Sequence, residues 1–125
     1  MKKLFYAFVI LFITASGLTL SAQNQKDVVG NWKYEVAQAP YGYNEGTIEI
    51  KNLKDKLIGE VNFHSGQAVK MQKLTMRNDT IWANIYVDSE NVQLIAKISN
   101  SKMKGSVNTS MGEMTLKADK IVEPK

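Results

Sequence analysis

From Gly30 onward, apolar and polar residues alternate in short runs that are separated by turn-forming residues. Successive side chains of a strand point to opposite faces, so this alternation is typical of antiparallel strands with one buried face. Pro40 and Pro124 fall outside the runs, as expected of a residue that cannot donate to a β ladder. The pattern predicts eight strands, at Asn31–Val36, Thr47–Lys51, Lys56–Phe63, Ala68–Met76, Thr80–Asp88, Val92–Ser99, Lys102–Thr109 and Glu113–Ala118.

The connections between the later strands are predicted to be two-residue hairpin turns. Cross-strand partners must share one face of the sheet, so the predicted turns are those that set apolar residues opposite one another. This places Leu94 opposite both Ile85 and Val107, and Val107 also opposite Leu116. The turns that meet this condition are Asn78-Asp79, Ser89-Glu90, Asn100-Ser101 and Met111-Gly112. Consecutive strands joined so closely form an up-and-down meander.

In the middle of the fourth run, the apolar residues switch from odd-numbered to even-numbered positions. Val69 and Met71 share one parity, whereas Leu74 and Met76 share the other. One extra residue at Gln72-Lys73, a β-bulge, would turn both pairs inward and bend the strand.

We therefore predict an all-β fold: an eight-stranded antiparallel up-and-down meander closed into a small barrel, since closure removes the exposed edges of an open sheet. The predicted lining includes Trp32, Tyr34, Ile48, Ile50, Leu57, Val61, Phe63, Ile85, Leu94, Val107 and Leu116. Chain entropy nearly balances the gain from burying such a lining in a small domain. Without disulfides, such a domain has little stability to spare for a large empty cavity, and the sequence leaves open whether the interior is filled or hollow.

One stretch of the sequence has an internal echo. Residues 56–62 (KLIGEVN) return as residues 102–108 (KMKGSVN), with Gly59 and Gly105 at the same place. A glycine in the middle of a strand permits a sharp bend or the close approach of a neighbour. The echo concerns architecture and carries no chemistry.

The N-terminus has the composition of a secretory signal peptide. Lys2 and Lys3 precede a short apolar run, and small residues at Ser21-Ala22 provide a cleavage site. The run has about 10 apolar residues, half of what a transmembrane helix needs. We expect a signal peptide over 1–22, a flexible segment over 23–29 and one barrel domain over 30–122. Absence of cysteine excludes a lipid-acceptor residue and disulfides. The expected product is a periplasmic or extracellular monomer that does not span a membrane.

Charge argues against nucleic acid as a partner. Removal of Lys2 and Lys3 lowers the formal net charge from +4 to +2. The remaining lysines are scattered singly and form no basic stripe, which is the footprint that nucleic-acid binding requires.

The tripeptide Gly30-Asn31-Trp32 at the start of the first strand, followed by a longer loop and a meander, resembles the Gly-x-Trp opening of lipocalin-like proteins in the calycin group. The resemblance implies a lipocalin-like barrel with the tryptophan closing one end and, often, a small apolar ligand in the other. The chain departs from that pattern in having no disulfide, a shorter length and no clear helix after the last strand.

The long loop from Gln38 to Gly46 suggests a ligand site. Tyr41 and Tyr43 flank a glycine and can offer flat apolar faces with polar tips across the barrel mouth. The alternative is that both tyrosines cap the core without touching a ligand. The predicted ligand is small and either apolar or saccharide, and the predicted ligand-binding residues are Tyr34, Tyr41, Tyr43 and Phe63.

The outer face of the fifth and sixth runs suggests a protein partner instead. The predicted register points Trp82 and Tyr86 outward, on the same face as Ile95 and Lys97. An exposed group of Trp82, Tyr86 and Ile95 is a plausible docking or inhibitory surface, although Lys97 can cover Trp82 by a cation–π contact. If the parity of that strand were reversed, Trp82 and Tyr86 would line the interior.

Catalysis is the function class with the least support. The chain has one histidine, His64, beside a predicted turn, and no cysteine. Acid–base and nucleophilic chemistry need converging groups, and a histidine-based metal site needs more ligands. Four glutamates fall on outward strand positions: Glu35, Glu49, Glu60 and Glu113. We expect no catalytic residue, no metal and no cofactor.

Overall fold

The structure, a computed structural model, describes residues 26–122. The predicted signal peptide at 1–22 therefore lies outside the described residues. The described part contains nine strands: β1 (Gly30–Glu35), β2 (Glu45–Leu53), β3 (Lys56–Phe63), β4 (Ala68–Lys70), β5 (Gln72–Arg77), β6 (Thr80–Val87), β7 (Glu90–Ser99), β8 (Lys102–Thr109) and β9 (Gly112–Lys120).

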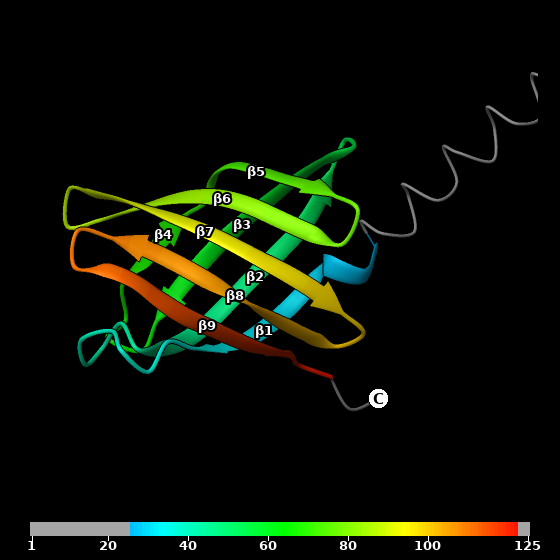
Figure 1. The fold of residues 1–125 in the computed structure, drawn as a ribbon. Coiled ribbons are helices and arrows are strands. Elements are labelled where there is room, and N and C mark those ends of the chain that lie inside the picture. Colours follow the sequence, from blue (N-terminus) through cyan, green and yellow to red (C-terminus); the bar gives the residue numbers. More distant parts are fainter. Residues whose placement is uncertain (1–25, 123–125) are drawn as a thin grey trace, which may run out of the picture.

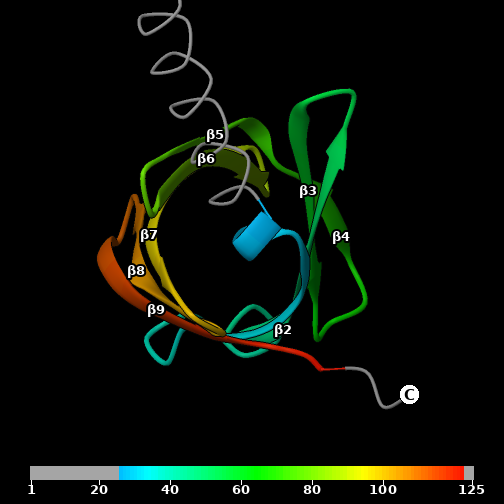
Figure 2. The ribbon, with the colours of Figure 1, turned by 90° about the vertical axis from the view of Figure 1, so that its right-hand side faces the viewer.

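The nine strands form one antiparallel sheet in the order β4-β3-β2-β1-β9-β8-β7-β6-β5. The sheet curls into a nearly closed barrel, and β1 lies beside β9 (Figures 1 and 2). The predicted all-β meander is confirmed.

The predicted number of eight strands is wrong, because the fourth run divides at Met71. Its first half, β4, pairs with β3, and its second half, β5, pairs with β6. The register shifts by one residue between Gln72 and Thr75, and Lys73 has a φ of 54°. The extra residue predicted at Gln72-Lys73 is therefore present, and the chain uses it to leave one neighbouring strand and join another.

The bulge has the predicted effect on the interior. Met71 is buried, and Val69, Leu74 and Met76 are half-buried against the core. The two ends of the sheet thus meet through a continuous chain and not through a ladder. At this seam the Met71 amide donates a hydrogen bond of 2.8 Å to the Gly59 carbonyl.

Two of the four predicted turns are confirmed and two are displaced by one residue. Asn78-Asp79 and Asn100-Ser101 are the turns of their hairpins, with Ile98 opposite Met103. The turn expected at Ser89-Glu90 is Asp88-Ser89, and that expected at Met111-Gly112 is Ser110-Met111. Each displacement moves the register by two residues. Faces are conserved, because the side-chain period of a strand is two.

One end of the barrel is closed by Trp32 and the residues before β1. Trp32 and Val28 are both fully buried, and the Trp32 indole Nε1 donates to the Val28 carbonyl at 2.9 Å. Residues 26–28 form a helical turn that lies inside the ring of strands (Figure 2). Lys120 covers this end, with Nζ 5.5 Å from the Trp32 ring centroid and 2.8 Å from the Asp27 carbonyl oxygen.

Flexibility was expected over 23–29, yet the described part of that segment is packed against the core through Val28. The tryptophan takes the end-closing position that the Gly-x-Trp resemblance implies. No charged side chain is buried within residues 26–122. No helix in this range is both long and apolar enough to cross a bilayer.

Candidate ligand cavity

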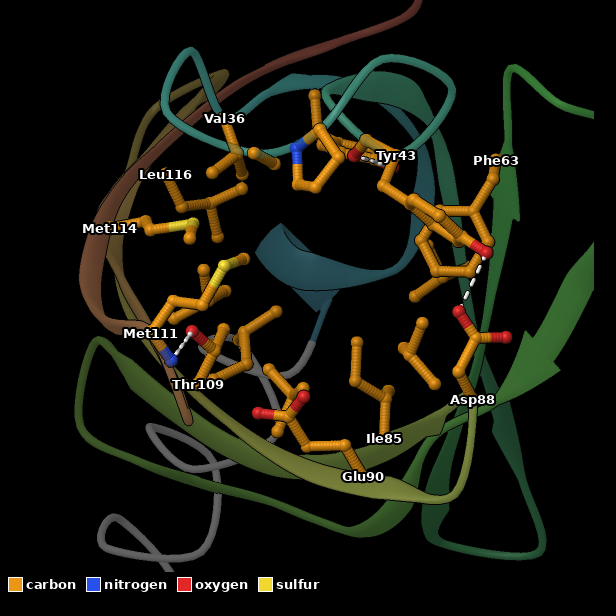
Figure 3. A pocket seen from close by; sticks show the side chains of 18 of the residues that line it. Val36, Tyr43, Phe63, Ile85, Asp88, Glu90, Thr109, Met111, Met114 and Leu116 are labelled. Carbon is orange, nitrogen blue, oxygen red and sulfur yellow. Dashed lines mark hydrogen bonds between the residues drawn. The ribbon is translucent and has the colours of Figure 1, made fainter.

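The other end of the barrel, called the mouth below, is formed by the β1–β2 loop and the turns after β3, β6 and β8 (Figure 1). It opens into a cavity of about 200 Å³. Apolar side chains form most of the lining: Val36, Ala39, Pro40, Ile48, Val61, Phe63, Ile85, Val87, Val92, Leu94, Val107, Met111, Met114 and Leu116. The polar lining residues are Tyr34, Tyr43, Asp88, Glu90 and Thr109 (Figure 3).

The apolar lining of the cavity follows directly from the alternation of the strands. Val92 and Leu94 on β7 point inward, as do Met114 and Leu116 on β9, because residues two apart share a face. An apolar cavity of ~150 Å³ is known to hold benzene, whereas drug-sized ligands occupy ~300 Å³ or more. The cavity therefore fits a ligand the size of one substituted ring or a short alkyl chain.

The loop between β1 and β2 is fixed across part of the mouth by backbone hydrogen bonds. The Val36 amide donates to the Asn44 carbonyl at 2.8 Å, and the Tyr43 amide donates to the Pro40 carbonyl at 3.0 Å. These bonds satisfy backbone groups that the strands leave unpaired, and they hold the Tyr43 ring against the cavity.

Tyr34, Tyr43 and Phe63 come together on one wall. The Tyr43 ring meets the Phe63 ring edge-on, with centroids 5.0 Å apart. The Tyr34 hydroxyl donates to the Tyr43 carbonyl at 3.0 Å, and the Tyr43 hydroxyl donates to Asp88 Oδ2 at 3.0 Å (Figure 3). Three of the four predicted ligand residues therefore line the cavity as one connected group.

Both phenols keep their protons at neutral pH. Burial raises the pKa of Tyr34, and the negative charge of Glu45 raises it further. The hydrogen bond to Asp88 is the main reason that the pKa of Tyr43 is also raised, because it holds the phenolic proton. The wall therefore presents neutral rings with a fixed hydroxyl at the mouth.

Tyr41 is placed differently from its predicted partner Tyr43. Its side chain is 88% exposed and does not line the cavity, and its ring centroid lies 6.4 Å from that of His64. Gly42 takes a φ of +95° between the two tyrosines, so they point in different directions. Tyr41 therefore lies outside the candidate site.

Three polar lining residues were missed by the sequence analysis: Asp88, Glu90 and Thr109. Glu90 accepts a hydrogen bond from the Ser110 amide, which ties the β6–β7 hairpin to the turn after β8. The signal that could have found Asp88 and Glu90 is turn position, because the turn at Asp88-Ser89 places both carboxylates at the mouth. The predicted turn at Ser89-Glu90 lies at the same end of the barrel, but the hydrophobic pattern does not show which way turn side chains point.

The candidate partner residues lie on the outer wall. Trp82 is 38% exposed and Tyr86 is 50% exposed, and Trp82 lies directly opposite the half-buried Ile95. Lys97 lies opposite Thr80 and pairs with Asp79 at 3.7 Å, so its charge is engaged at the hairpin end. Trp82 and Tyr86 do not line the interior cavity. We call Trp82, Tyr86 and Ile95 the outer patch.

His64 lies at the mouth in an exposed turn. Its Nδ1 is 3.9 Å from Glu45 Oε1, and the histidine side chain is 57% exposed. Within residues 26–122, no three histidine, aspartate or glutamate side chains gather as metal ligands would.

Comparison with known proteins supports the fold only. No protein-family model matches the chain, and a search of curated proteins gives no significant match. A redesigned β barrel superposes with a TM-score of 0.61 at 15% identity, covering 79% of this chain and 96% of that one. Secretory abundant heat soluble protein 4 from Ramazzottius varieornatus has a TM-score of 0.52 at 11% identity, with 78% and 96% coverage.

A variant of the fluorescent protein UnaG also matches, with a TM-score of 0.52 at 12% identity. The match covers 78% of this chain and 99% of that one. At these identities the likeness concerns architecture alone. The chain is similar to calycin-like barrels in fold, as the Gly30-Asn31-Trp32 opening implied, and no sequence family is assigned.

Proposed function

We propose that the protein is an exported binding module that holds a small, mostly apolar ligand at the barrel mouth without transforming it. The observation that carries the proposal is the mostly apolar cavity of about 200 Å³ at the mouth of the barrel. Close packing is the rule in protein interiors, and a small domain without disulfides has little stability to spare for a void. A ligand that fills the cavity would offset this cost.

The distribution of polar groups supports this proposal. Tyr43, Asp88, Glu90 and Thr109 stand at the mouth, while the inner walls are formed by side chains such as Leu94 and Leu116. Ligand pockets combine these two features, since apolar walls supply affinity and a few polar groups set the orientation.

A neutral ring compound of matching size tests the proposal. We expect 2-phenylethanol to shift the methyl NMR signals of Ile85, Leu94 and Val107, with a Kd in roughly the millimolar range or tighter. Val87→Phe should abolish binding, because Val87 is half-buried and lines the cavity, so the larger ring fills it.

The matched control is Val122→Phe, the same change at a residue that is 80% exposed and outside the cavity. It should leave both binding and thermal stability unchanged. Equal binding by a folded Val87→Phe protein, or signal changes confined to the outer wall, would contradict the proposal.

The outer patch supports a second candidate, a protein-interaction or inhibitor module. Trp82 and Ile95 are direct cross-strand neighbours on the outer face, and Tyr86 lies on the same strand face as Trp82. Aromatic residues are enriched at protein–protein interfaces relative to the rest of the surface. Trp82→Ser should abolish co-purification of a partner from the native source while the melting temperature stays the same, and an unchanged co-purification profile would reject this candidate.

Export rests on the sequence of residues 1–22. Intact-mass analysis of the protein from its native source should give a chain that starts at Gln23. A chain that retains Met1 or Lys2 would reject the proposed cleavage.

A further inference from the structure

The mouth and the closed end of the barrel carry opposite charges. The four segments that form the mouth, 36–46, 63–68, 86–91 and 108–113, contain Glu45, Asp88, Glu90 and Glu113 but no lysine or arginine. The segments at the closed end, 26–30, 51–56, 77–80, 99–102 and 119–121, contain seven lysine and arginine residues against four aspartates. The modest net charge of the chain conceals this separation.

Two of the acidic residues belong to the cavity itself. Asp88 and Glu90 line it, whereas no lysine or arginine does. The Glu90 carboxylate is turned toward the centre of the ring of side chains, and Asp88 stands beside Tyr43 (Figure 3). A ligand whose polar end faces the mouth therefore has that end close to these carboxylates.

Both carboxylates are held in place by neutral donors. Asp88 accepts from the Tyr43 hydroxyl, and Glu90 accepts from the Ser110 amide. Within residues 26–122 neither carboxylate has a lysine, arginine or histidine nitrogen within ion-pairing distance, since the ion pairs there involve other acidic residues. Their charges are thus positioned but not neutralised.

We propose that the cavity selects a cationic ligand, a small apolar group that carries an ammonium. This inference rests on the proposed ligand-binding function and specifies its chemical class. The apolar part enters between the strands, and the ammonium lies at the mouth, where Glu90 can accept a charge-assisted hydrogen bond and the charge of Asp88 adds attraction. A carboxylate at the same place would be repelled and would lose its hydration without a compensating cation.

The acidic residues around the mouth also favour a cationic ligand. A cleft lined by charges of one sign beside apolar walls concentrates the electrostatic potential and attracts counter-charged ligands. Glu45 and Glu113 add to this potential from the surrounding segments. The basic closed end repels cations, so the mouth is the favoured point of approach.

Three compounds of nearly equal shape test the proposal: 2-phenylethylammonium, 2-phenylethanol and phenylacetate. At pH 7 and low salt, we expect the ammonium to bind about tenfold or more tightly than the alcohol, as a charged hydrogen bond implies. Phenylacetate should bind most weakly. Added salt should weaken binding of the ammonium and leave the alcohol unaffected.

Variants that remove the negative charges identify the residues responsible for the preference for the ammonium. Glu90→Gln, and more strongly the double variant Asp88→Asn/Glu90→Gln, should bring the ratio of ammonium affinity to alcohol affinity down toward one. Both replacements retain an amide oxygen that can accept the present hydrogen bonds. Asp55→Asn changes the net charge by the same one unit as Glu90→Gln, but at the far end of the barrel in a turn where φ is 66°, and should leave the preference for the ammonium unchanged.

The outcomes separate this inference from the function on which it rests. Equal binding of ammonium and alcohol, or tighter binding of phenylacetate, would overturn the charge selection but leave a ligand-binding cavity. Failure of all three compounds to bind would count against the proposed function itself. An ammonium preference that persists in the folded double variant would show that other groups produce it.

Discussion

At the scale of single residues, Gly59 and Gly105 show how two equivalent positions of a sequence echo face different neighbours. A Cβ added at Gly105 would lie 1.9 Å from the Ile95 carbonyl oxygen and 2.5 Å from the Ala96 Cα, both backbone atoms. At Gly59 it would lie 2.7 Å from the Met71 sulfur, which belongs to a flexible side chain. The close approach expected of a mid-strand glycine is therefore strict only at Gly105.

Replacing each glycine by alanine should separate the two cases. We expect Gly105→Ala to lower the free energy of unfolding by more than about 2 kcal/mol, because the backbone of β7 must move. Gly59→Ala should cost less than about 1 kcal/mol, since the Met71 side chain can rotate away. Urea unfolding of both variants measures this difference, and equal losses would contradict the assignment.

Tyr34 should make stability depend on alkaline pH. Its folded-state pKa is raised above the ordinary value of about 10, so the folded chain holds the phenolic proton more tightly than the unfolded chain does. The resulting stabilisation is fully present below the unfolded pKa and is lost as the pH rises through the folded pKa.

Tyr34→Phe removes this titration. The variant should therefore lose less stability than the wild type when the pH is raised above about 10. Urea unfolding as a function of pH checks this expectation, with Tyr41→Phe, at an exposed tyrosine, as the control. Parallel pH profiles of wild type and Tyr34→Phe would show that the Tyr34 phenol does not contribute.

At the scale of elements, the position of a hairpin turn sets the register of its two strands, which the burial pattern alone does not determine. Asp88 and Ser89 take φ values of 51° and 68°, the left-handed conformation of a tight hairpin turn. Moving this turn by one residue shifts the register by two and leaves every side chain on the same face. The apolar pattern therefore fits Ser89-Glu90 as well as Asp88-Ser89, and the sequence did not distinguish them.

Ser89→Gly should stabilise the β6–β7 hairpin. Serine at a φ of 68° is strained, and glycine adopts that conformation freely, so we expect a gain of about 0.5–1 kcal/mol. The control is Ser101→Gly in the β7–β8 turn, where φ is not positive and glycine only adds entropy to the unfolded chain. Thermal unfolding should show opposite signs for the two variants.

The site is harder to predict from the sequence than the fold, because the hydrophobic pattern does not determine the conformations of loops and turns. Alternation along each strand was enough to identify the core, the bulge near Lys73 and the inward positions of Tyr34 and Phe63. The loop conformation at Gly42 separates Tyr41 from Tyr43, and the turn conformation at Asp88 brings a carboxylate to the mouth. Neither conformation follows from hydrophobic pattern.

At the scale of the whole molecule, the barrel is closed at one end by residues that precede its first strand. Val28 is fully buried, and its carbonyl is the acceptor for the Trp32 indole. A chain that begins at Gly30 loses both contacts. It should be less stable than one that begins at Gln23 by about 2–3 kcal/mol.

Trimming the opposite terminus provides the control for that comparison. A chain that ends at Ile121 loses residues 122–125, of which Val122 is 80% exposed, and should retain its stability within about 0.5 kcal/mol. Equal losses from the two ends would show that Val28 has no special part in closing the barrel.

The seam between β4 and β5 gives the cylinder a preferred line of weakness. Elsewhere each strand is laddered to two neighbours, whereas β4 and β5 each have one and are joined through Met71. Local fluctuations that part the β3–β4 ladder from the β5–β6 ladder leave the other ladders intact, so amide hydrogens of β4 and β5 should exchange with solvent by partial opening, well before those of β7 and β8. The barrel can thus open locally along this seam without unfolding, while the ladders of β7 and β8 stay paired.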